Sequence, residues 1–384
     1  MKKSVLPILV ILLMALQSSS ALQLDEGTQL TIYTYDSLLA YPGYDYIGNF
    51  SAYAGVSRDS INLVTFSDAT EILTRSAVEK DSPQADVLIG LDNVLVHKAR
   101  SENILQPYVP STIANIPQEL IDGLADDNLL TPYDYGVISL YYDKNRVGDL
   151  GNFTLNDLTD KQLANKLVLE NPLLSSPGLG FLLWTNAELG SQSSEWNTLW
   201  TNIRDNGRLV DSWGDAYNVF ATKESDRPIM VSYTSSPAFD KCLYNDSSTA
   251  ALLTTGESGK VRGWQQIEGI GLVKNAQHEA LAKQFIDWFI DSNVQENIYL
   301  NQWMYPAMSG IEIPACYNSS TYTPEDIIPY NSELTPQDIT QNLDKWLNAW
   351  EELYVVNTNP TPLPTWVFMF GLAIFVVIRK KYSD

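Results

Sequence analysis

The sequence predicts an α/β protein in which mostly parallel sheets are covered by helices and divided between two lobes. Between residues 62 and 104, short apolar runs alternate with amphipathic segments in the order strand, helix, strand, helix, which is typical of a parallel sheet. The chain has 384 residues, too many for one small domain and suited to two lobes. No repeat or low-complexity stretch interrupts residues 24–356, so this region is expected to fold as an ordinary globular unit.

The predicted elements follow this alternation along the chain. Strands are expected within 30–36, 62–66, 85–91, 129–147, 167–172 and 227–233. Helices are expected within 68–80, 94–104, 179–189 and, as a pair, 278–301.

Polar and aromatic side chains follow several of the predicted strands. These clusters are Tyr35-Asp36-Ser37, Gly90-Leu91-Asp92-Asn93, Ser175-Ser176-Pro177-Gly178 and Tyr233-Thr234-Ser235-Ser236. In open α/β sheets, ligands bind beyond the carboxyl ends of the strands. The four clusters are therefore predicted to line one cleft.

The N-terminus has the layout of a secretory signal peptide, predicted here as residues 1–22. Two lysines precede an apolar run from Val5 to Leu16, and small residues follow up to Ala21. This segment contains no cysteine, so the usual bacterial N-terminal lipid anchor is excluded.

The C-terminus predicts a different anchor. Residues 357–364 form a Pro/Thr spacer that cannot be helical, and an apolar run then continues to Ile378 before Arg379-Lys380-Lys381. We interpret residues 365–384 as a transmembrane anchor with its basic end in the cytoplasm; a buried C-terminal helix is the alternative. The main domain is accordingly expected outside the cell, tethered to the outer face of the cytoplasmic membrane.

The composition limits the partners of this domain. The formal net charge is −22, and both terminal segments are positively charged, so the domain between them is more acidic still. Such a charge argues against nucleic acid and anionic lipid as partners and can help to attract a cationic ligand. A role in solubility or in adaptation to salt explains the charge equally well. Cys242 and Cys316 both lie in the extracellular part, which permits one disulfide.

Nothing in the sequence indicates an enzyme, a cofactor or a metal site. His97 and His278 lie within helical patterns and are interpreted as surface residues. No zinc-ligand spacing, GxSxG motif or P-loop is present, and no spacing singles out a pair of carboxylates. Tyr141 and Tyr142 are consecutive strand residues that point to opposite faces, so they are not expected to share an iron ion.

The strand-end clusters belong to a longer series of motifs that resembles a known family, the substrate-binding proteins of thiamine ABC transporters. The motifs are LTIYTYDS (30–37), ADVLIGLDN (85–93), PYDYGVISLYYDKN (132–145), SSPGLGFLLW (175–184), SWGDAYNVF (212–220), VSYTSSPAF (231–239) and NQWMYPA (301–307). The resemblance implies the two-lobed periplasmic-binding-protein type 2 fold, with two crossover strands and hinge closure around the ligand. We expect residues 23–130 and 262–356 to form lobe 1 and residues 131–261 to form lobe 2.

The resemblance also implies ligand-binding residues. Aromatic plates are expected at Tyr35, Trp213, Tyr233, Phe239 and Trp303, a carboxylate at Asp68, and a serine near the hydroxyl or phosphate end of the ligand at Ser175. Thiamine has a flat aminopyrimidine and a permanently cationic thiazolium, which suit aromatic walls and a carboxylate.

Two positions depart from the family pattern. Phe239 stands where the family often has tyrosine, and Ala69 stands where it often has glycine. These departures leave open the choice between thiamine, thiamine monophosphate and thiamine diphosphate.

The resemblance therefore implies a receptor without catalytic activity. It would capture thiamine or a phosphate ester outside the cell and deliver it to an ABC permease with a cytosolic ATPase. The alternatives are a receptor for another cationic or phosphorylated small solute and, from a different class, an anchored surface hydrolase.

Overall fold

A computed structural model describes residues 27–39, 43–125, 127–222, 225–256, 259–318 and 322–355. The predicted signal peptide (1–22), spacer (357–364) and transmembrane anchor (365–384) lie outside these ranges. Of the helices within them, none is both long enough and apolar enough to cross a membrane.

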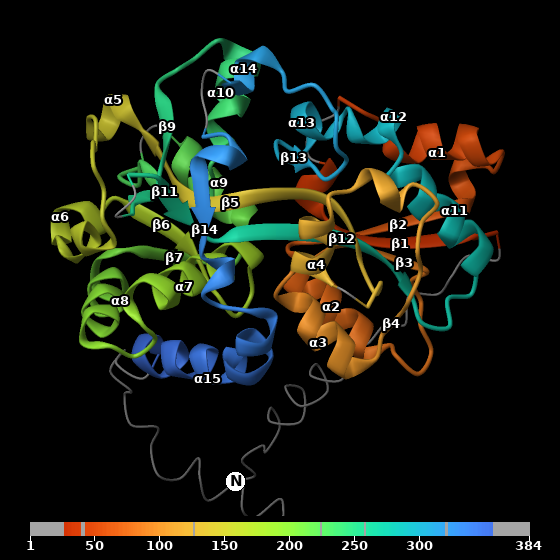
Figure 1. The fold of residues 1–384 in the computed structure, drawn as a ribbon, viewed down its shortest axis with the longest axis horizontal. Coiled ribbons are helices and arrows are strands. Elements are labelled where there is room, and N and C mark those ends of the chain that lie inside the picture. Colours follow the sequence, from red (N-terminus) through yellow and green to blue (C-terminus); the bar gives the residue numbers. More distant parts are fainter. Residues whose placement is uncertain are drawn as a thin grey trace, which may run out of the picture.

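One large sheet runs through both lobes (Figure 1). Its strands follow the order β2-β1-β3-β12-β5-β8-β6-β7, with β4, β9 and β13 paired beside this path, and a second sheet has the order β10-β11-β14. The strands are β1 (Leu30–Tyr35), β2 (Ile61–Phe66), β3 (Val87–Asp92), β4 (Leu105–Gln106), β5 (Thr131–Asp143), β6 (Leu167–Glu170), β7 (Arg208–Val210), β8 (Ile229–Tyr233), β9 (Thr249–Leu252), β10 (Thr254–Thr255), β11 (Val261–Gly263), β12 (Gln265–Val273), β13 (Tyr305–Pro306) and β14 (Ile327–Pro329).

The parallel arrangement expected from the sequence lies in the outer strands of each lobe. In lobe 1, β1 pairs in parallel with β2 and β3, and in lobe 2, β6 pairs in parallel with β7 and β8. At the centre, β12 and β5 run antiparallel to each other and to the strands beside them. The sheet is therefore mixed, because the two strands that connect the lobes reverse the strand direction.

Strands β5 and β12 are the two crossover strands that the resemblance implied. The first half of β5 pairs with β12 and β13 on the lobe 1 side, for example Tyr135 with Tyr305. Its second half pairs with β8 and β9 in lobe 2, for example Leu140 with Val231. Both strands cross the middle of the molecule (Figure 1).

Helices cover both halves of the sheet. They are α1 (Tyr46–Ala54), α2 (Ala69–Val78), α3 (Leu95–Glu102), α4 (Gln118–Leu124), α5 (Lys144–Val147), α6 (Lys161–Ala164), α7 (Ser176–Leu189), α8 (Ser194–Asn206), α9 (Trp213–Ala221), α10 (Ser236–Tyr244), α11 (Glu279–Phe289), α12 (Ser292–Gln295), α13 (Ile298–Asn301), α14 (Ala315–Asn318) and α15 (Pro336–Val355). Helix α7 begins at Ser176, earlier than the predicted start near Leu179, because Pro177 is well placed in a first helical turn and Ser175 is extended before it. The predicted helix pair at 278–301 is instead α11 followed by two short helices.

The C-terminal segment, which was expected to lie in lobe 1 as part of residues 262–356, contacts both lobes. Helix α15 packs on α8 of lobe 2, where the rings of Trp350 and Trp200 lie 5.9 Å apart and Arg204 donates to the Leu353 carbonyl oxygen at 3.0 Å. At its other end, the Thr340 hydroxyl lies 2.8 Å from Nδ1 of His97 in α3 of lobe 1. Helix α15 thus contacts both lobes, and in Figure 1 it lies below α8 at the lower left with one end toward α3.

A disulfide makes a further connection to lobe 2. Cys242 of α10 and Cys316 of α14 are bonded, with Cα atoms 5.3 Å apart. Residue Ala307, which precedes α14, still belongs to lobe 1, where its N–H donates to the Tyr133 carbonyl oxygen. The segment between Ala307 and Cys316 therefore passes from lobe 1 to lobe 2.

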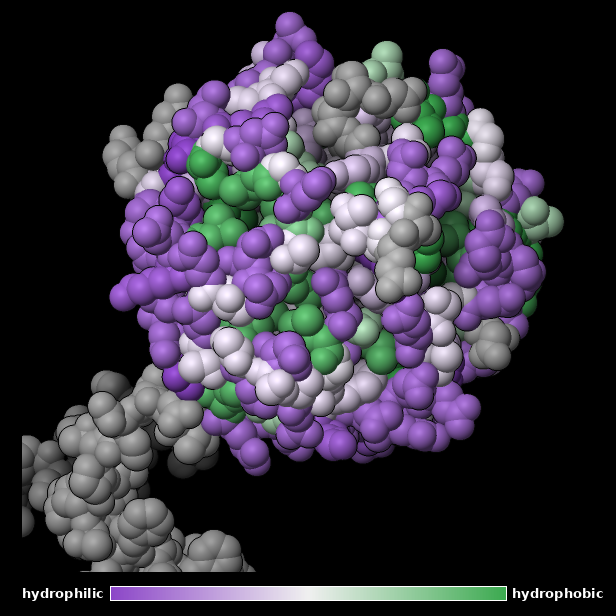
Figure 2. All heavy atoms as spheres, turned by 60° about the vertical axis from the view of Figure 1, so that its left-hand side comes forward, coloured by the Kyte–Doolittle hydropathy of each residue, from purple (hydrophilic) through white to green (hydrophobic). Residues whose placement is uncertain are grey.

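The outer surface is largely hydrophilic. Figure 2 shows that hydrophilic side chains cover most of one face, with smaller apolar patches between them. The large side chains are mostly inside, and Trp184, Trp196, Trp200, Trp264 and Trp350 are all fully buried. Burial of these rings gives lobe 2 a substantial apolar core.

Candidate functional site

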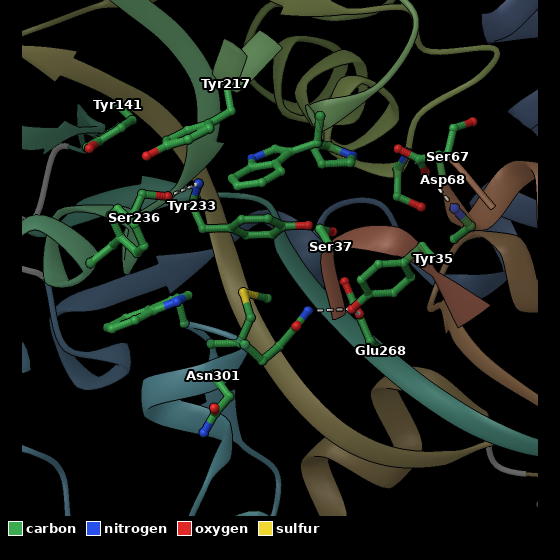
Figure 3. Close-up of a pocket in the computed structure, with 18 residues that line it drawn as sticks. Tyr35, Ser37, Ser67, Asp68, Tyr141, Tyr217, Tyr233, Ser236, Glu268 and Asn301 are labelled. Atoms are coloured by element: carbon green, nitrogen blue, oxygen red, sulfur yellow. Dashed lines mark hydrogen bonds between the residues drawn. The ribbon is translucent and has the colours of Figure 1, made fainter. Parts of the chain in front are cut away.

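A cavity of about 300 Å³ lies between the two lobes. This volume is at the lower end of the range of roughly 300–1,000 Å³ found for small-molecule sites. The lining residues, drawn in Figure 3, are Tyr35, Ser37, Ser67, Asp68, Ala69, Tyr141, Ser176, Pro177, Trp213, Tyr217, Tyr233, Ser236, Phe239, Glu268, Asn301, Gln302, Trp303 and Met304. They come from both lobes, so the cavity is complete only when the lobes are close together.

Tyr35 enters the cavity from the carboxyl end of β1 in lobe 1. Its ring lies against Gly90, where an added Cβ atom would come within 2.2 Å of the ring. Gly90 also has a φ of 105°, which favours glycine. The glycine of the predicted GLDN cluster therefore serves the cavity by making room for Tyr35.

The Tyr35 hydroxyl joins a hydrogen-bond network beneath the cavity floor. It donates to Oε2 of Glu268 at 2.5 Å and lies 2.9 Å from the Tyr133 hydroxyl. The side-chain amide of Gln302 donates to the Tyr35 hydroxyl at 2.5 Å. These bonds fix the orientation of the Tyr35 ring, and Figure 3 shows Tyr35 and Glu268 side by side.

Asp68 connects the two lobes. As the N-cap of α2, it accepts a hydrogen bond at Oδ1 from the Ala69 N–H at 2.8 Å. The same oxygen accepts the N–H of Ser176, the first residue of α7 in lobe 2, at 3.0 Å. Burial raises the pKa of the Asp68 carboxyl to about 6, against the opposing effect of the Ser176 N–H.

Two aromatic pairs form the walls on the other side. The ring of Trp213 stacks on Tyr217 with an interplanar angle of 12° and a centroid distance of 5.4 Å, and its indole N–H donates to Ser232 at 2.9 Å. Phe239 of α10 meets Trp303 edge to face at 5.1 Å. Flat surfaces held this firmly can receive a flat ligand ring.

Trp303 has an unusual backbone conformation. Its φ is 61°, in the left-handed region that a bulky residue rarely adopts. Such a conformation costs on the order of 1–3 kcal/mol and persists only where the surrounding structure enforces it. This strained conformation places the Trp303 side chain in the wall of the cavity.

The cavity is lined by carboxylates without basic side chains. Asp68 and Glu268 are its acidic residues, and its described lining contains no lysine, arginine or histidine. Burial raises the pKa of Glu268 to about 7. The site therefore has the electrostatic character of a cation receptor.

The structure brings together most of the side chains predicted from the resemblance. Tyr35, Asp68, Trp213, Tyr233, Phe239 and Trp303 all line the cavity. Ser175 does not line it; Ser175 is fully buried, and the neighbouring Ser176 faces the cavity instead. The reason is that Ser175 precedes the first turn of α7, which turns the following residue toward the interlobe space.

Three of the four strand-end clusters contribute to the lining, and the fourth does not. The cluster after β3 is used for structure: Asp92 accepts the N–H groups of Val94 and Leu95, both at 2.8 Å. Asn93 binds β12, accepting the Ile267 N–H at 3.0 Å and donating to the Gln265 carbonyl oxygen at 3.2 Å. This cluster therefore joins β3 to a crossover strand.

Several lining residues were not predicted from the sequence. Glu268 could have been found, because it is the one acidic residue within the predominantly apolar segment Ile267–Val273. Tyr217 lies one helical turn after Trp213, a spacing at which two rings can stack. Gln302 adjoins Trp303 but carries no separate sequence signal.

Tyr141 lines the cavity and Tyr142 does not. The Tyr141 hydroxyl donates to Asp240, which also accepts the Thr249 hydroxyl at 2.7 Å. Tyr142 packs in a different apolar cluster from Tyr141. The two tyrosines are thus separated as the strand alternation predicts. Among the described residues there is also no group of three histidine, cysteine or acidic side chains that could hold a metal ion.

Known proteins resemble this chain over most of its length. A thiamine-binding periplasmic protein from Brucella suis is 28% identical over 326 residues, covering 84% of this chain and 90% of that protein. The thiamine-binding periplasmic protein of Escherichia coli is 27% identical, covering 84% of this chain and 92% of that protein. A solved periplasmic thiamin binding protein superposes with a TM-score of 0.70 at 25% identity, covering 85% of this chain and 96% of that one.

A more distant solved structure, iron-bound HitA from Pseudomonas aeruginosa, has a TM-score of 0.68 at 16% identity, covering 85% of this chain and 99% of that one; it shows the shared fold. Residues 82–321 match the family described as bacterial extracellular solute-binding protein. This match spans more than half of the chain, so the chain belongs to this family of bacterial extracellular solute-binding proteins.

Proposed function

We propose that the protein captures thiamine, or a phosphate ester of thiamine, in the interlobe cavity and delivers it to the permease of an ABC importer. The observation that carries the proposal is a cavity walled by aromatic rings and carboxylates, without a basic residue in its described lining. The names of the relatives from Brucella suis and Escherichia coli support thiamine as the ligand.

The chemistry of the cavity suits the two halves of thiamine. Trp213, Tyr233, Phe239 and Trp303 offer flat surfaces to the aminopyrimidine and thiazolium rings. A cation over an aromatic face gains about 0.5–2 kcal/mol, with the larger value where water is excluded. The Asp68 and Glu268 carboxylates supply opposite charge on the lobe 1 side.

Asp68 and Tyr35 are proposed to fix the ligand's position. The second oxygen of Asp68 is not engaged by the Ala69 and Ser176 N–H groups, so it can accept a hydrogen bond from the amino group of the ligand. Tyr35 is held by Glu268 and Gln302, so its ring forms a rigid wall. Ser176 takes the place that the resemblance gave to Ser175, near the hydroxyl or phosphate end.

The protein is further proposed to work outside the cytoplasmic membrane. Residues 1–22 would direct export, and residues 365–384 would tether the binding domain to the outer face of the membrane through the spacer 357–364. A tether of this kind would hold the receptor near its permease.

Native mass spectrometry of the purified protein tests the proposal. The full chain, released from detergent in the spectrometer, is mixed with a panel of vitamins that includes thiamine and both of its phosphate esters. One bound thiamine or ester per chain is expected. A different bound cation or phosphorylated solute would show that the receptor serves another ligand, and conversion of a bound compound would indicate a hydrolase.

A further inference from the structure

Glu268 is one of the two cavity carboxylates, and the groups around it set its protonation state. It belongs to crossover strand β12, lines the cavity and is only 4% exposed. A buried glutamate is rarely found without a partner of opposite charge, because removing an ionised carboxylate from water is costly.

The hydrogen-bond partners of Glu268 favour its ionised form. The Tyr35 and Tyr133 hydroxyls donate to Oε2 at 2.5 and 2.6 Å, and the side-chain amide of Gln266 donates to Oε1 at 2.9 Å. Three donors directed at one carboxylate hold it in a fixed orientation. None of these donors carries a charge, so they do not neutralise it.

The titratable groups around Glu268 add no positive charge. Asp134 faces it from β5 and Asp92 from β3, while Tyr35, Tyr133 and Tyr233 approach from β1, β5 and β8. Burial and the charge of Glu268 raise the pKa of Asp134 well above its usual range, so Asp134 stays neutral. Within the described structure, both carboxyl oxygens of Asp134 lack a hydrogen-bond partner.

The described residues around Glu268 therefore supply no positive charge to balance its ionised carboxylate. Burial raises the pKa of Glu268 to about 7, against the three hydrogen bonds that favour ionisation, so about half of the Glu268 side chains carry a proton at neutral pH. A cation placed in the cavity favours the ionised form and lowers the pKa of Glu268.

We propose that Glu268 is the counter-ion of the bound cation and that it releases its proton to solvent when thiamine binds. This inference rests on the proposed function. The proton leaves the carboxyl oxygen and enters the buffer, and no other bond is made or broken. Because the thiazolium charge of thiamine is permanent, proton release near neutral pH must come from the protein.

The expected size of the effect follows from the titration of Glu268. At pH 7 the binding of one thiamine should release about half a proton, given a pKa of about 7 before binding. The ionised fraction rises about fourfold between pH 6.5 and pH 8.5, so the dissociation constant should fall about fourfold over the same interval.

Titration calorimetry measures both quantities on the full chain in nonionic detergent. Thiamine is titrated at pH 7 in phosphate and in Tris, whose ionisation enthalpies differ, and the difference in binding heat gives the number of protons released. Three variants are compared with the parent: Glu268→Gln, Asp68→Asn and Glu102→Gln.

The variants have separate expected results. Glu268→Gln should bind thiamine more weakly and release almost no proton at pH 7. Asp68→Asn should also bind more weakly but keep most of the proton release, because the pKa of Asp68 is about 6 and this carboxyl is mostly ionised at pH 7. Glu102→Gln changes a surface carboxylate of lobe 1 and should resemble the parent in both respects.

The outcomes separate this inference from the proposed function. Thiamine binding without proton release, or with equal release by parent and Glu268→Gln, overturns the role of Glu268 and leaves the proposed function standing. Absence of thiamine binding by the parent overturns both. If Glu268→Gln does not fold, the parent protein is titrated with the aminopyrimidine half of thiamine, which lacks the thiazolium charge. Binding of this compound should release no proton. Equal proton release on binding of thiamine and of the aminopyrimidine overturns the inference.

Discussion

Lowering the pH from 7.5 to 5.0 is expected to stabilise the unliganded protein against unfolding. Asp68 and Glu268 line the cavity and are almost inaccessible to solvent. Burial raises their pKa values from 3.8 and 4.5 to about 6 and about 7. Burial also raises the pKa values of Asp134 and Glu170 well above their usual range.

The sign of the effect follows from proton binding. Between pH 4.5 and pH 7, the folded protein holds protons on these carboxyl groups that the unfolded chain has already released. The free energy of unfolding therefore falls as the pH rises through this window. The pKa values of surface carboxylates such as Asp45 and Glu102 are lowered in the folded protein. Their contribution to stability is therefore lost only as the pH falls toward these lowered pKa values, below this window.

The magnitude is large for a change of pH alone. A shift of one pKa unit corresponds to about 1.4 kcal/mol, so Asp68 and Glu268 contribute on the order of 3 kcal/mol each over their full titration. Burial lowers the pKa of His97, which opposes the trend because the unfolded chain protonates first as the pH falls. One such partly buried group reduces the effect but does not reverse it.

Urea denaturation at constant ionic strength checks this prediction. The free energy of unfolding of the full chain should be higher at pH 5.0 than at pH 7.5, by several kcal/mol. Glu268→Gln removes one titrating group and should flatten the dependence, while Glu102→Gln should leave it unchanged. A free energy of unfolding that rises from pH 5.0 to pH 7.5 would refute the reasoning, because it would place the buried carboxyl groups in their ionised form throughout.

Four further predictions concern the cavity and the disulfide. Trp303→Ala should weaken thiamine binding by about 2–4 kcal/mol, as for a buried aromatic anchor, and Trp303→Phe should cost less; calorimetry with a melting-temperature control tests both. Asp68→Asn should weaken binding about ten- to hundredfold, from the loss of a charge-assisted bond worth roughly 1.5–3 kcal/mol, and unchanged affinity in a folded variant would remove Asp68 from the site. Ser176→Pro, which deletes the N–H bound to Asp68 together with the Ser176 hydroxyl, should weaken binding less than Asp68→Asn. Thiol labelling of unreduced, denatured protein should find neither Cys242 nor Cys316 free, and two free thiols would contradict the disulfide.

Much of the fold follows from local sequence patterns. The apolar runs at 62–66 and 85–91 form β2 and β3 because the alternation of strand and helix fixes which segments can pair in parallel. The cavity walls Trp213 and Trp303 were predicted from a family resemblance. Neither residue could have been assigned by chemistry alone, since most tryptophans of this chain are core residues.

Other features depend on contacts between segments that are distant in sequence. The role of Glu268 depends on hydroxyls from β1 and β5, and no local pattern places these side chains around one carboxylate. The GLDN cluster after β3 has the composition of a binding loop, yet Asp92 and Asn93 are used to cap α3 and hold β12. Helix α15 has one apolar stripe, which shows that it packs on something but not that it packs across both lobes.

The position of Asp68 would couple binding of the proposed ligand to closure of the lobes. Its carboxylate caps α2 in lobe 1 and accepts the first N–H of α7 in lobe 2, so two helix N-termini stabilise one negative charge only while the lobes are together. Asp68→Asn weakens this closure contact as well as any contact with the ligand, and its loss of affinity contains both effects. Ser176→Pro removes the closure N–H and the Ser176 hydroxyl, whereas Ser176→Ala removes the hydroxyl alone, so these two variants differ by the closure contact. The proline is expected to be tolerated, because Ser175 is already extended, as a residue before proline must be, and a first helical turn accepts proline. The loss of affinity in Asp68→Asn beyond the difference between Ser176→Pro and Ser176→Ala therefore measures what the Asp68 charge contributes to the ligand itself.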